Sequence, residues 1–274
     1  STSSAASDVY KRQHKNFSAK KFFILFILFF SFSLSADPLQ KAVNNEFRDL
    51  KNTSRDIYRN PYETLSFFEL EPSMTVVELS PGGGWYTEIL ASYLDNSGTL
   101  IAAHFDRNSS NNYLKKSRIN FEKKISSEAI YNKVKIVDLT SKLSEPGSVD
   151  AVLTFRNLHN WLGPMMDKVF SNTFTALKSG GIFGIVEHRA LKGTSMKDMK
   201  KSGYVTEDHA IEIAEKHGFR LVSRSEINAN PKDTKNHPKG VWTLPPSLRL
   251  KEKNKDKYVA IGESDRMTLL FKKP

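Results

Sequence analysis

The chain has 274 residues, 39% of them hydrophobic, which suits one large or two small globular domains and excludes a disordered chain. Its formal charge is +11, but the first 36 residues hold five Lys or Arg and one Asp, so the remainder carries 36 basic and 29 acidic residues, or +7; we interpret this excess as solvated loops and expect no nucleic-acid partner. The absence of cysteine excludes disulfides, thiolate zinc sites and cysteine nucleophiles.

Two N-terminal segments are not expected to belong to the globular fold. Residues 1–13 are rich in Ser and Ala without periodicity, and we interpret them as a non-native tail. Residues 14–36 combine lysines, an apolar block at 22–34 and small residues, a pattern typical of a secretory signal peptide cleaved near Ser35 or Ala36. The alternative is an uncleaved anchor, although the block is shorter than the about 18 apolar residues of a membrane span. We expect a periplasmic or secreted protein that meets a membrane only through this segment, if it is retained.

Residues 37–72 are predicted to form an N-terminal helical cap. A polar-faced helix is expected over residues 39–59, because Pro61 cannot continue a helix interior, and a second short helix is expected over residues 62–68. The main domain is then expected to span residues 73–274.

The main domain alternates between runs typical of strands and runs typical of helices. Thr206 is a candidate N-cap and Gly218 a candidate stop for one helix. Strands regularly separated by helices predict an α/β, Rossmann-like doubly wound sheet, with a ligand at the carboxyl ends of its central strands. Strands are predicted at residues 74–80, 98–105, 134–139, 149–155, 180–188, 219–227 and 265–274, and helices at residues 84–94, 164–180 and 206–219.

The turn after the first of these strands predicts a ligand site. It reads Glu78-Leu79-Ser80-Pro81-Gly82-Gly83-Gly84, and glycines here let a ligand approach the backbone and the amide end of the next helix. A dinucleotide site would need G-x-G-x-x-G spacing, and a carboxylate would repel phosphate. Glu78 therefore favours a ligand that has a cationic amino group and no phosphate, such as S-adenosylmethionine; the alternative is that the glycines serve the turn geometry only.

Acidic residues also follow the next two strands. Asp106 is placed to accept the two hydroxyls of a ribose, and Asp138 to accept from an adenine amino group. Either alone is equally well explained as an ordinary loop aspartate. Three acidic residues at the ends of three successive strands indicate a site, and residues 156–161, "RNLHNW", add polar groups and an aromatic ring at the same edge.

Together these motifs resemble class I S-adenosylmethionine-dependent methyltransferases over about residues 55–274. The resemblance is carried by "VVELSPGGGWYT", "HFD", "IVDLT", "FRNLHNW" and "LKSGGIFGIVEHR", with Ser80 in place of the first glycine of the family's motif. "RDIYRNPYETL", "GVWTLPP" and "IGESDRMTLLFKKP" are most similar to bacterial predicted methyltransferases with N-terminal signal sequences, and "FRN" has a looser likeness to quinone C-methyltransferases. The resemblance implies a seven-stranded sheet whose last strand is antiparallel.

The resemblance also implies methyl transfer from S-adenosylmethionine to a small-molecule acceptor. Asn157 and His159 are then expected on the substrate side, with His159 or His188 as a base, although a hydrogen-bonded structural role explains a lone histidine at least as well. Trp161 and Trp242 are candidates for the wall of the acceptor pocket, although aromatic side chains more often simply belong to the core. The cofactor would be held by Glu78, Ser80, Gly82, Gly84, Asp106 and Asp138, and no metal ligand set is predicted.

Two alternative functions remain open. One is an NAD(P)-dependent oxidoreductase on a similar sheet, which the glycine spacing and Glu78 disfavour. The other is a catalytically idle methyltransferase fold that acts as a binding protein of the cell envelope. This second alternative arises because S-adenosylmethionine is made in the cytoplasm, whereas the signal-like segment points outward.

Overall fold

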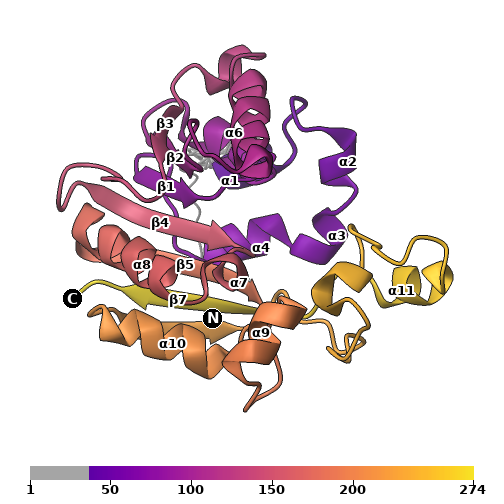
Figure 1. The fold of residues 1–274 in the computed structure, drawn as a ribbon. Coiled ribbons are helices and arrows are strands. Elements are labelled where there is room, and N and C mark those ends of the chain that lie inside the picture. The colour runs from indigo at the N-terminus through magenta and orange to yellow at the C-terminus, as the bar shows by residue number, and fades with distance from the viewer. Residues whose placement is uncertain (1–36) are drawn as a thin grey trace, which may run out of the picture. The chain divides into compact units, whose positions relative to one another are not determined.

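The computed structural model describes residues 37–274 (Figure 1). The predicted tail and signal peptide lie outside the described residues, so their interpretation stays a prediction. Among the described helices, none is both long and apolar enough to cross a membrane.

The centre of the fold is one seven-stranded sheet in the order β3-β2-β1-β4-β5-β7-β6. The first five strands are parallel, and β7 runs antiparallel to both of its neighbours. This confirms the predicted doubly wound α/β fold with an antiparallel last strand. The strands are β1 Thr75–Leu79, β2 Thr99–His104, β3 Lys135–Asp138, β4 Val149–Phe155, β5 Leu177–His188, β6 Arg220–Ser225 and β7 Arg266–Lys272.

Helices cover both faces of the sheet, because alternate side chains of each central strand point to opposite sides. In β1, Val77 and Leu79 join a core with α7, α8 and α10, whereas Val76 joins a core with α1, α4, α5 and α6 (Figure 1). The helices are α1 Pro38–Val43, α2 Leu50–Thr53, α3 Asp56–Arg59, α4 Pro61–Phe67, α5 Thr87–Leu94, α6 Asn112–Ile125, α7 Leu158–Trp161, α8 Pro164–Ala176, α9 Met196–Ser202, α10 Glu207–Lys216 and α11 Lys255–Ile261, with 3₁₀ turns η1 Ala129–Tyr131 and η2 Gly240–Thr243.

The prediction of one helix over residues 39–59 is wrong, because the segment folds as α1, α2 and α3. The Asn45 side chain donates to the Ala42 carbonyl and accepts from the Phe47 amide, so it offers the backbone partners that a helix would otherwise supply. The chain turns again at Asp49, the N-cap residue of α2. The short helix predicted after Pro61 is present as α4.

The N-terminal helices are held on the sheet by polar contacts at α5. Trp85 Nε1 donates to the Asn52 carbonyl at 3.0 Å, and the Asn52 amide donates to the buried carboxylate of Glu88 at 2.8 Å. Lys124 of α6 pairs with the same carboxylate at 2.5 Å. These contacts hold α2 against α5 and α6, next to the turn between β1 and α5.

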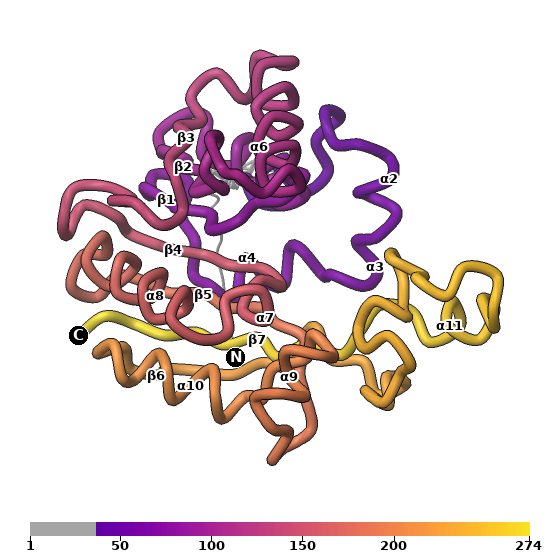
Figure 2. The backbone as a smooth tube through the Cα atoms, viewed as in Figure 1, coloured from indigo at the N-terminus to yellow at the C-terminus, as the bar shows by residue number. Residues whose placement is uncertain are grey.

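The segment between β6 and β7, residues 226–265, is a long excursion that contains η2 and α11 and runs beside α3 (Figure 2). Asn60 donates to the Ile227 carbonyl at 2.7 Å, and Arg55 pairs with Glu263 at 2.7 Å. The N-terminal helices and this excursion therefore face each other across the carboxyl edge of the sheet. Thr206 caps α10 through its side chain, and Gly218 follows its end at φ +92°, as predicted.

We predict that Gly184→Ala lowers the free energy of unfolding by about 1–3 kcal/mol, the usual cost of overpacking a core. A Cβ on Gly184 of β5 would lie 2.8 Å from Leu153 Cδ2 and 2.9 Å from Phe68 Cδ1, so α4 would be pushed off the sheet. Urea denaturation measures the loss. Gly83→Ala is the matched control, because a Cβ at Gly83 meets nothing within 4 Å; equal effects of the two substitutions would contradict the prediction.

Candidate functional site

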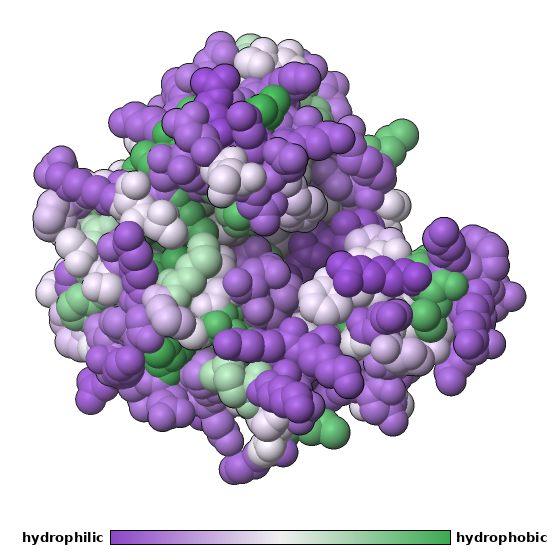
Figure 3. All heavy atoms as spheres, in the orientation of Figure 1, coloured by the Kyte–Doolittle hydropathy of each residue, from purple (hydrophilic) through white to green (hydrophobic). Residues whose placement is uncertain are grey.

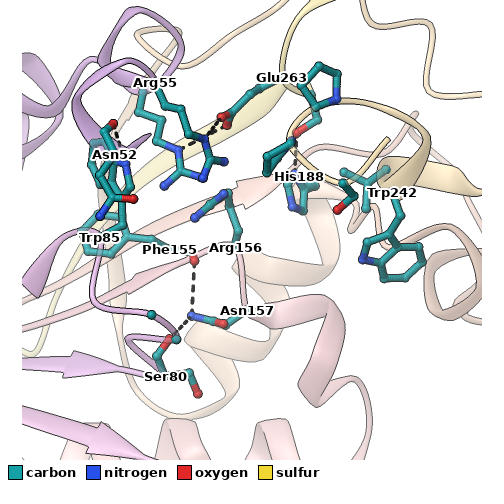
Figure 4. A pocket seen from close by; sticks show the side chains of 18 of the residues that line it. Asn52, Arg55, Ser80, Trp85, Phe155, Arg156, Asn157, His188, Trp242 and Glu263 are labelled. Carbon is teal, nitrogen blue, oxygen red and sulfur yellow. Dashed lines mark hydrogen bonds and ion pairs between the residues drawn. The ribbon is translucent and has the colours of Figure 1, made fainter. Parts of the chain in front are cut away.

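A cavity of about 420 Å³ lies at the carboxyl edge of the sheet, where the strand order reverses between β1 and β4. Figure 3 shows the surface hollowed there, with mostly hydrophilic residues around it. The walls come from α2 and α3, the glycine turn, the segment after β4 and the excursion between β6 and β7 (Figure 4). The expectation that the ligand site lies at this edge therefore agrees with the position of the cavity.

The glycine turn presents open backbone to this cavity. A Cβ at Gly82 or Gly83 would meet nothing within 4 Å, whereas a Cβ at Gly84 would lie 3.2 Å from the Lys124 side chain. Gly82 and Gly83 line the cavity, and Gly84 instead packs against α6. A second cavity of about 320 Å³, lined by Gly82, Gly83 and residues of α6, lies on the other side of the turn.

Ser80 opens the turn in a strained state. Its φ is 49°, in the left-handed region that glycine tolerates best, and its Oγ is buried without a hydrogen-bond partner. Its amide donates to the Ala103 carbonyl at 2.8 Å, which fixes the turn to β2. A buried hydroxyl without a partner beside a cavity is a natural contact for a bound ligand.

Glu78 is enclosed between β1 and α5 and does not line the cavity. It is 2% exposed, and Thr87 Oγ1 donates to its Oε2 at 2.6 Å. Burial raises the pKa of the Glu78 carboxyl to about 7, although the Thr87 hydrogen bond acts in the opposite direction. The hydrogen bond from Thr87 to Glu78 joins β1 to the first turn of α5.

His104, the last residue of β2, supports the glycine turn and was not predicted as a site residue. Its ring is fully buried, with Nε2 3.2 Å from the Gly82 carbonyl and Nδ1 accepting from the Phe105 amide at 2.7 Å. These contacts require a neutral ring that carries its proton on Nε2, and burial lowers the pKa of His104 to about 4. The sequence feature that could have marked His104 as a site residue is its position at the carboxyl end of β2.

Asp106 and Asp138 lie outside both of these cavities. Asp106 is exposed and accepts from the Asn108 amide of its own loop at 2.8 Å. Asp138 pairs with Arg118 at 2.9 Å, and Arg118 also donates to the Phe105 carbonyl. The structure therefore does not gather the three predicted acidic residues in one cavity, and their cofactor contacts stay predictions.

Asn157 and His159 both line the cavity, with different partners. The Asn157 amide donates to the carbonyls of Leu79 and Ser80, each at 3.2 Å, so it links β4 to the glycine turn (Figure 4). His159 Nδ1 lies 3.0 Å from Glu187 Oε1, which leaves Nε2 as the ring nitrogen without a protein partner among residues 37–274. The carboxylate thus orients the imidazole ring, an arrangement that is compatible with proton transfer at Nε2.

Glu187 and His188 complete a cluster with His159 whose candidate ligand atoms lie within 4.8 Å of one another, a spacing that fits a metal ion. Both Glu187 oxygens, however, accept backbone N–H groups, one from His188 and one from Leu158. Burial, followed by the charges of His159 and Arg156, holds the pKa of His188 well below its ordinary value. The cluster is thus largely satisfied by the protein itself.

Only one of the two candidate tryptophans of the acceptor pocket lies there. Trp242 lines the cavity, and its ring meets the His159 ring edge-on at 5.9 Å between centroids. Trp161 is 1% exposed in the core and does not line the cavity, so for this residue the structural interpretation holds and the pocket interpretation does not. Its apolar body on the buried face of α7 explains this position.

A group of arginines around Glu263 was not predicted. Arg55, Arg59 and Arg266 each donate to the Glu263 carboxylate, at 2.7, 3.3 and 3.3 Å. Arg156 lies beside them at φ +63° (Figure 4). The five residues come from α3, the end of β4, the excursion and β7, so no local sequence pattern identifies them.

No protein-family model matches the sequence, and no curated protein matches it significantly. Solved structures do match. A SAM-dependent methyltransferase from Aquifex aeolicus is 15% identical with a TM-score of 0.55, over 87% of this chain and 100% of that one. The [4+2]-cyclase SpnF is 15% identical with a TM-score of 0.57, over 86% of this chain and 92% of that one. A geranyl diphosphate methyltransferase in complex with SAM is 12% identical with a TM-score of 0.52, over 86% of this chain and 95% of that one. At these identities the likeness shows the fold, which is that of the class I methyltransferases.

We predict that Glu78→Gln stabilises the protein at pH 8 but hardly at pH 5. Folding raises the pKa of Glu78 from 4.5 to about 7, so between these two values the unfolded chain ionises while the folded protein stays protonated, and the folded protein ionises only above about pH 7. Between pH 5 and pH 8 the wild type should therefore lose about 2.5 kcal/mol of stability that the Gln variant keeps, since a tenfold change in proton affinity corresponds to about 1.4 kcal/mol. Denaturant unfolding of both proteins measures the difference, and an equal gap at the two pH values would refute it.

Proposed function

We propose that the protein is an S-adenosylmethionine-dependent methyltransferase that acts on a small-molecule acceptor. The observation that carries the proposal is the open glycine turn at the switch point of a class I methyltransferase sheet, with the 420 Å³ cavity directly against it. The fold alone would not carry it, because one fold hosts several chemistries, as the cyclase neighbour illustrates.

The residues at the turn fit the cofactor in part. Gly82 and Gly83 leave open space over their backbone, and the Ser80 hydroxyl lacks a partner. Asp106, exposed beyond β2, is free to accept ribose hydroxyls, and Asp138 would bind the base while paired with Arg118. Glu78 fits least well, since Thr87 already occupies one of its oxygens. When bound, S-adenosylmethionine supplies an electrophilic methyl group.

The remaining chemistry would come from the chain's own side chains. Glu187 fixes the Nδ1 side of the His159 ring, so that Nε2 is available to accept a proton from an acceptor hydroxyl or activated carbon. Asn157 would act by positioning, since its amide holds the glycine turn against β4. Trp242 would exclude water from the side of His159. Most of the rate would then come from holding the acceptor in line with the methyl group.

The proposal includes the compartment in which the protein acts and the group of methyltransferases that it resembles. The signal-like pattern of residues 14–36 supports a periplasmic or secreted protein, close to the signal-bearing bacterial methyltransferases that its motifs resemble. Residues 37–72 would serve as a cap over the methyltransferase domain at 73–274, consistent with the placement of α2 and α3 above the glycine turn. The idle-fold alternative is kept, because binding of the cofactor decides between the two.

Calorimetric titration of the protein with S-adenosylmethionine and with S-adenosylhomocysteine tests this proposal. We expect both to bind, and Gly83→Leu to weaken both by at least about tenfold, because the new side chain would extend into the open space over the turn. Gly83→Ala is the control for size and should lose less. The unfolding midpoint of each variant shows whether it is folded.

Absence of binding to both ligands would refute the proposal and favour the idle fold. A parallel fluorescence titration with NADH tests the oxidoreductase alternative, and we expect no binding there because the turn lacks G-x-G-x-x-G spacing.

A further inference from the structure

We propose that the cavity holds an acidic methyl acceptor, a small molecule whose carboxylate or phosphate group is bound by Arg55, Arg59 and Arg156. The description of this molecule as the acceptor rests on the proposed function. The anion site itself rests on the geometry of the arginines alone.

The lining of the cavity has an unbalanced charge. Its basic residues are Lys51, Arg55, Arg59 and Arg156, and its one acidic residue is Glu263. Arg266 binds the same carboxylate from behind. The four arginines and Glu263 together carry a formal charge of +3, in a site that α3 and the excursion partly shield from water.

Several guanidinium donors aimed at this cavity are buried and unpaired. Arg59 is 1% exposed, and neither its Nη1 nor its Nη2 has a hydrogen-bond partner. The same holds for Arg55 Nη2. Arg156 has no side-chain hydrogen bond or ion pair to any residue of the described part of the chain, although its guanidinium lines the cavity (Figure 4). Buried donors of this kind are costly unless a ligand pairs with them.

The arginines are held in place before any ligand binds. Arg59 Nε is fixed by Glu263 at 3.3 Å, and its guanidinium lies 4.6 Å from the centre of the Trp85 ring. Arg55 Nε is fixed by the other Glu263 oxygen at 2.7 Å. Both therefore present their remaining N–H groups as a rigid fork, the geometry that recognises carboxylate and phosphate.

The pKa values of the arginines and of Glu263 reflect how closely their charges lie together. Burial, with Arg266 and Arg55 adding to it, lowers the pKa of Arg156 to about 10, and burial and Arg156 lower that of Arg59. Although burial alone would raise it, the pKa of Glu263 is held at about 2 by the surrounding arginines. One carboxylate thus pairs with three of these cations and leaves Arg156 without a partner, and a second anion would relieve their repulsion.

The carboxylate of S-adenosylmethionine does not account for this site. One carboxylate pairs fully with one guanidinium fork, whereas three arginines here have free N–H groups or no partner. The cofactor also carries a sulfonium and an ammonium group, so it would add positive charge to a site that is already cationic. An acidic acceptor would offset the charges of both the cluster and the cofactor.

Binding of inorganic phosphate and of benzoate to the protein tests the site, with chloride at equal ionic strength as the control for general salt effects. We expect calorimetry to show binding that chloride does not reproduce, and the comparison of the two probes distinguishes a phosphate from a carboxylate ligand. Arg156→Gln should weaken it by at least about tenfold, the loss of a charge-assisted contact, and should raise the unfolding midpoint of the free protein because it relieves repulsion. Arg224→Gln is the matched control, since Arg224 lies outside the cavity, is 58% exposed and pairs with Glu207, and it should change little.

Arg55→Gln provides a second test that is independent of the backbone strain at Arg156 and should also weaken anion binding. The titrations are then repeated with saturating S-adenosylmethionine, where we expect anion affinity to be kept or increased. The inference would be overturned if neither probe binds, or if binding is unchanged in both Arg variants. Displacement of the anion by S-adenosylmethionine would overturn it as well. If S-adenosylmethionine does not bind, the proposed function fails, and the anion titrations without it still decide the site.

Discussion

The site depends on one buried carboxylate, Glu263, at the end of the excursion between β6 and β7. It is 3% exposed and accepts from Arg55 and Arg59 of the N-terminal helices and from Arg266, which begins β7. Three separate parts of the chain therefore meet at a single group. Removing one partner from such a buried pairing typically costs about 3–5 kcal/mol, so the helices above the cavity, its outer wall and the sheet are stabilised together.

The strands were the part of the fold that the sequence predicts best. Central parallel strands are buried on both faces, so they appear as continuous apolar runs such as those around Val77 and Val152, and glycines or caps such as Thr206 mark the helix limits. The N-terminal segment misled the prediction because its helical periodicity is interrupted at Asn45, whose side chain bonds the backbone locally, and again at Asp49, where α2 begins. Periodicity alone does not register that competition.

The site was predictable only where it follows the order of the strands. The glycine turn, Asn157 and His159 stand directly after β1 and β4, and they line one cavity. Asp106 follows β2 and Asp138 ends β3, but both lie outside this cavity; Asp106 is hydrogen-bonded within its own loop, and Asp138 is paired with Arg118. The arginine cluster was out of reach, since the contact between Arg55 and Glu263 spans 208 residues and depends on the completed fold.

The insertion of β7 between β5 and β6 also constrains when the cavity can form during synthesis. β6 lies at the edge of the sheet and pairs with β7, so it has no strand partner until β7, later in the chain, has been made. Glu263, and with it the anchor for Arg55 and Arg59, is likewise translated only shortly before β7. The five parallel strands end at His188, so all of them are translated before Glu263 and β7. The residues of the glycine turn are therefore translated well before the carboxylate on which the cationic half of the cavity depends.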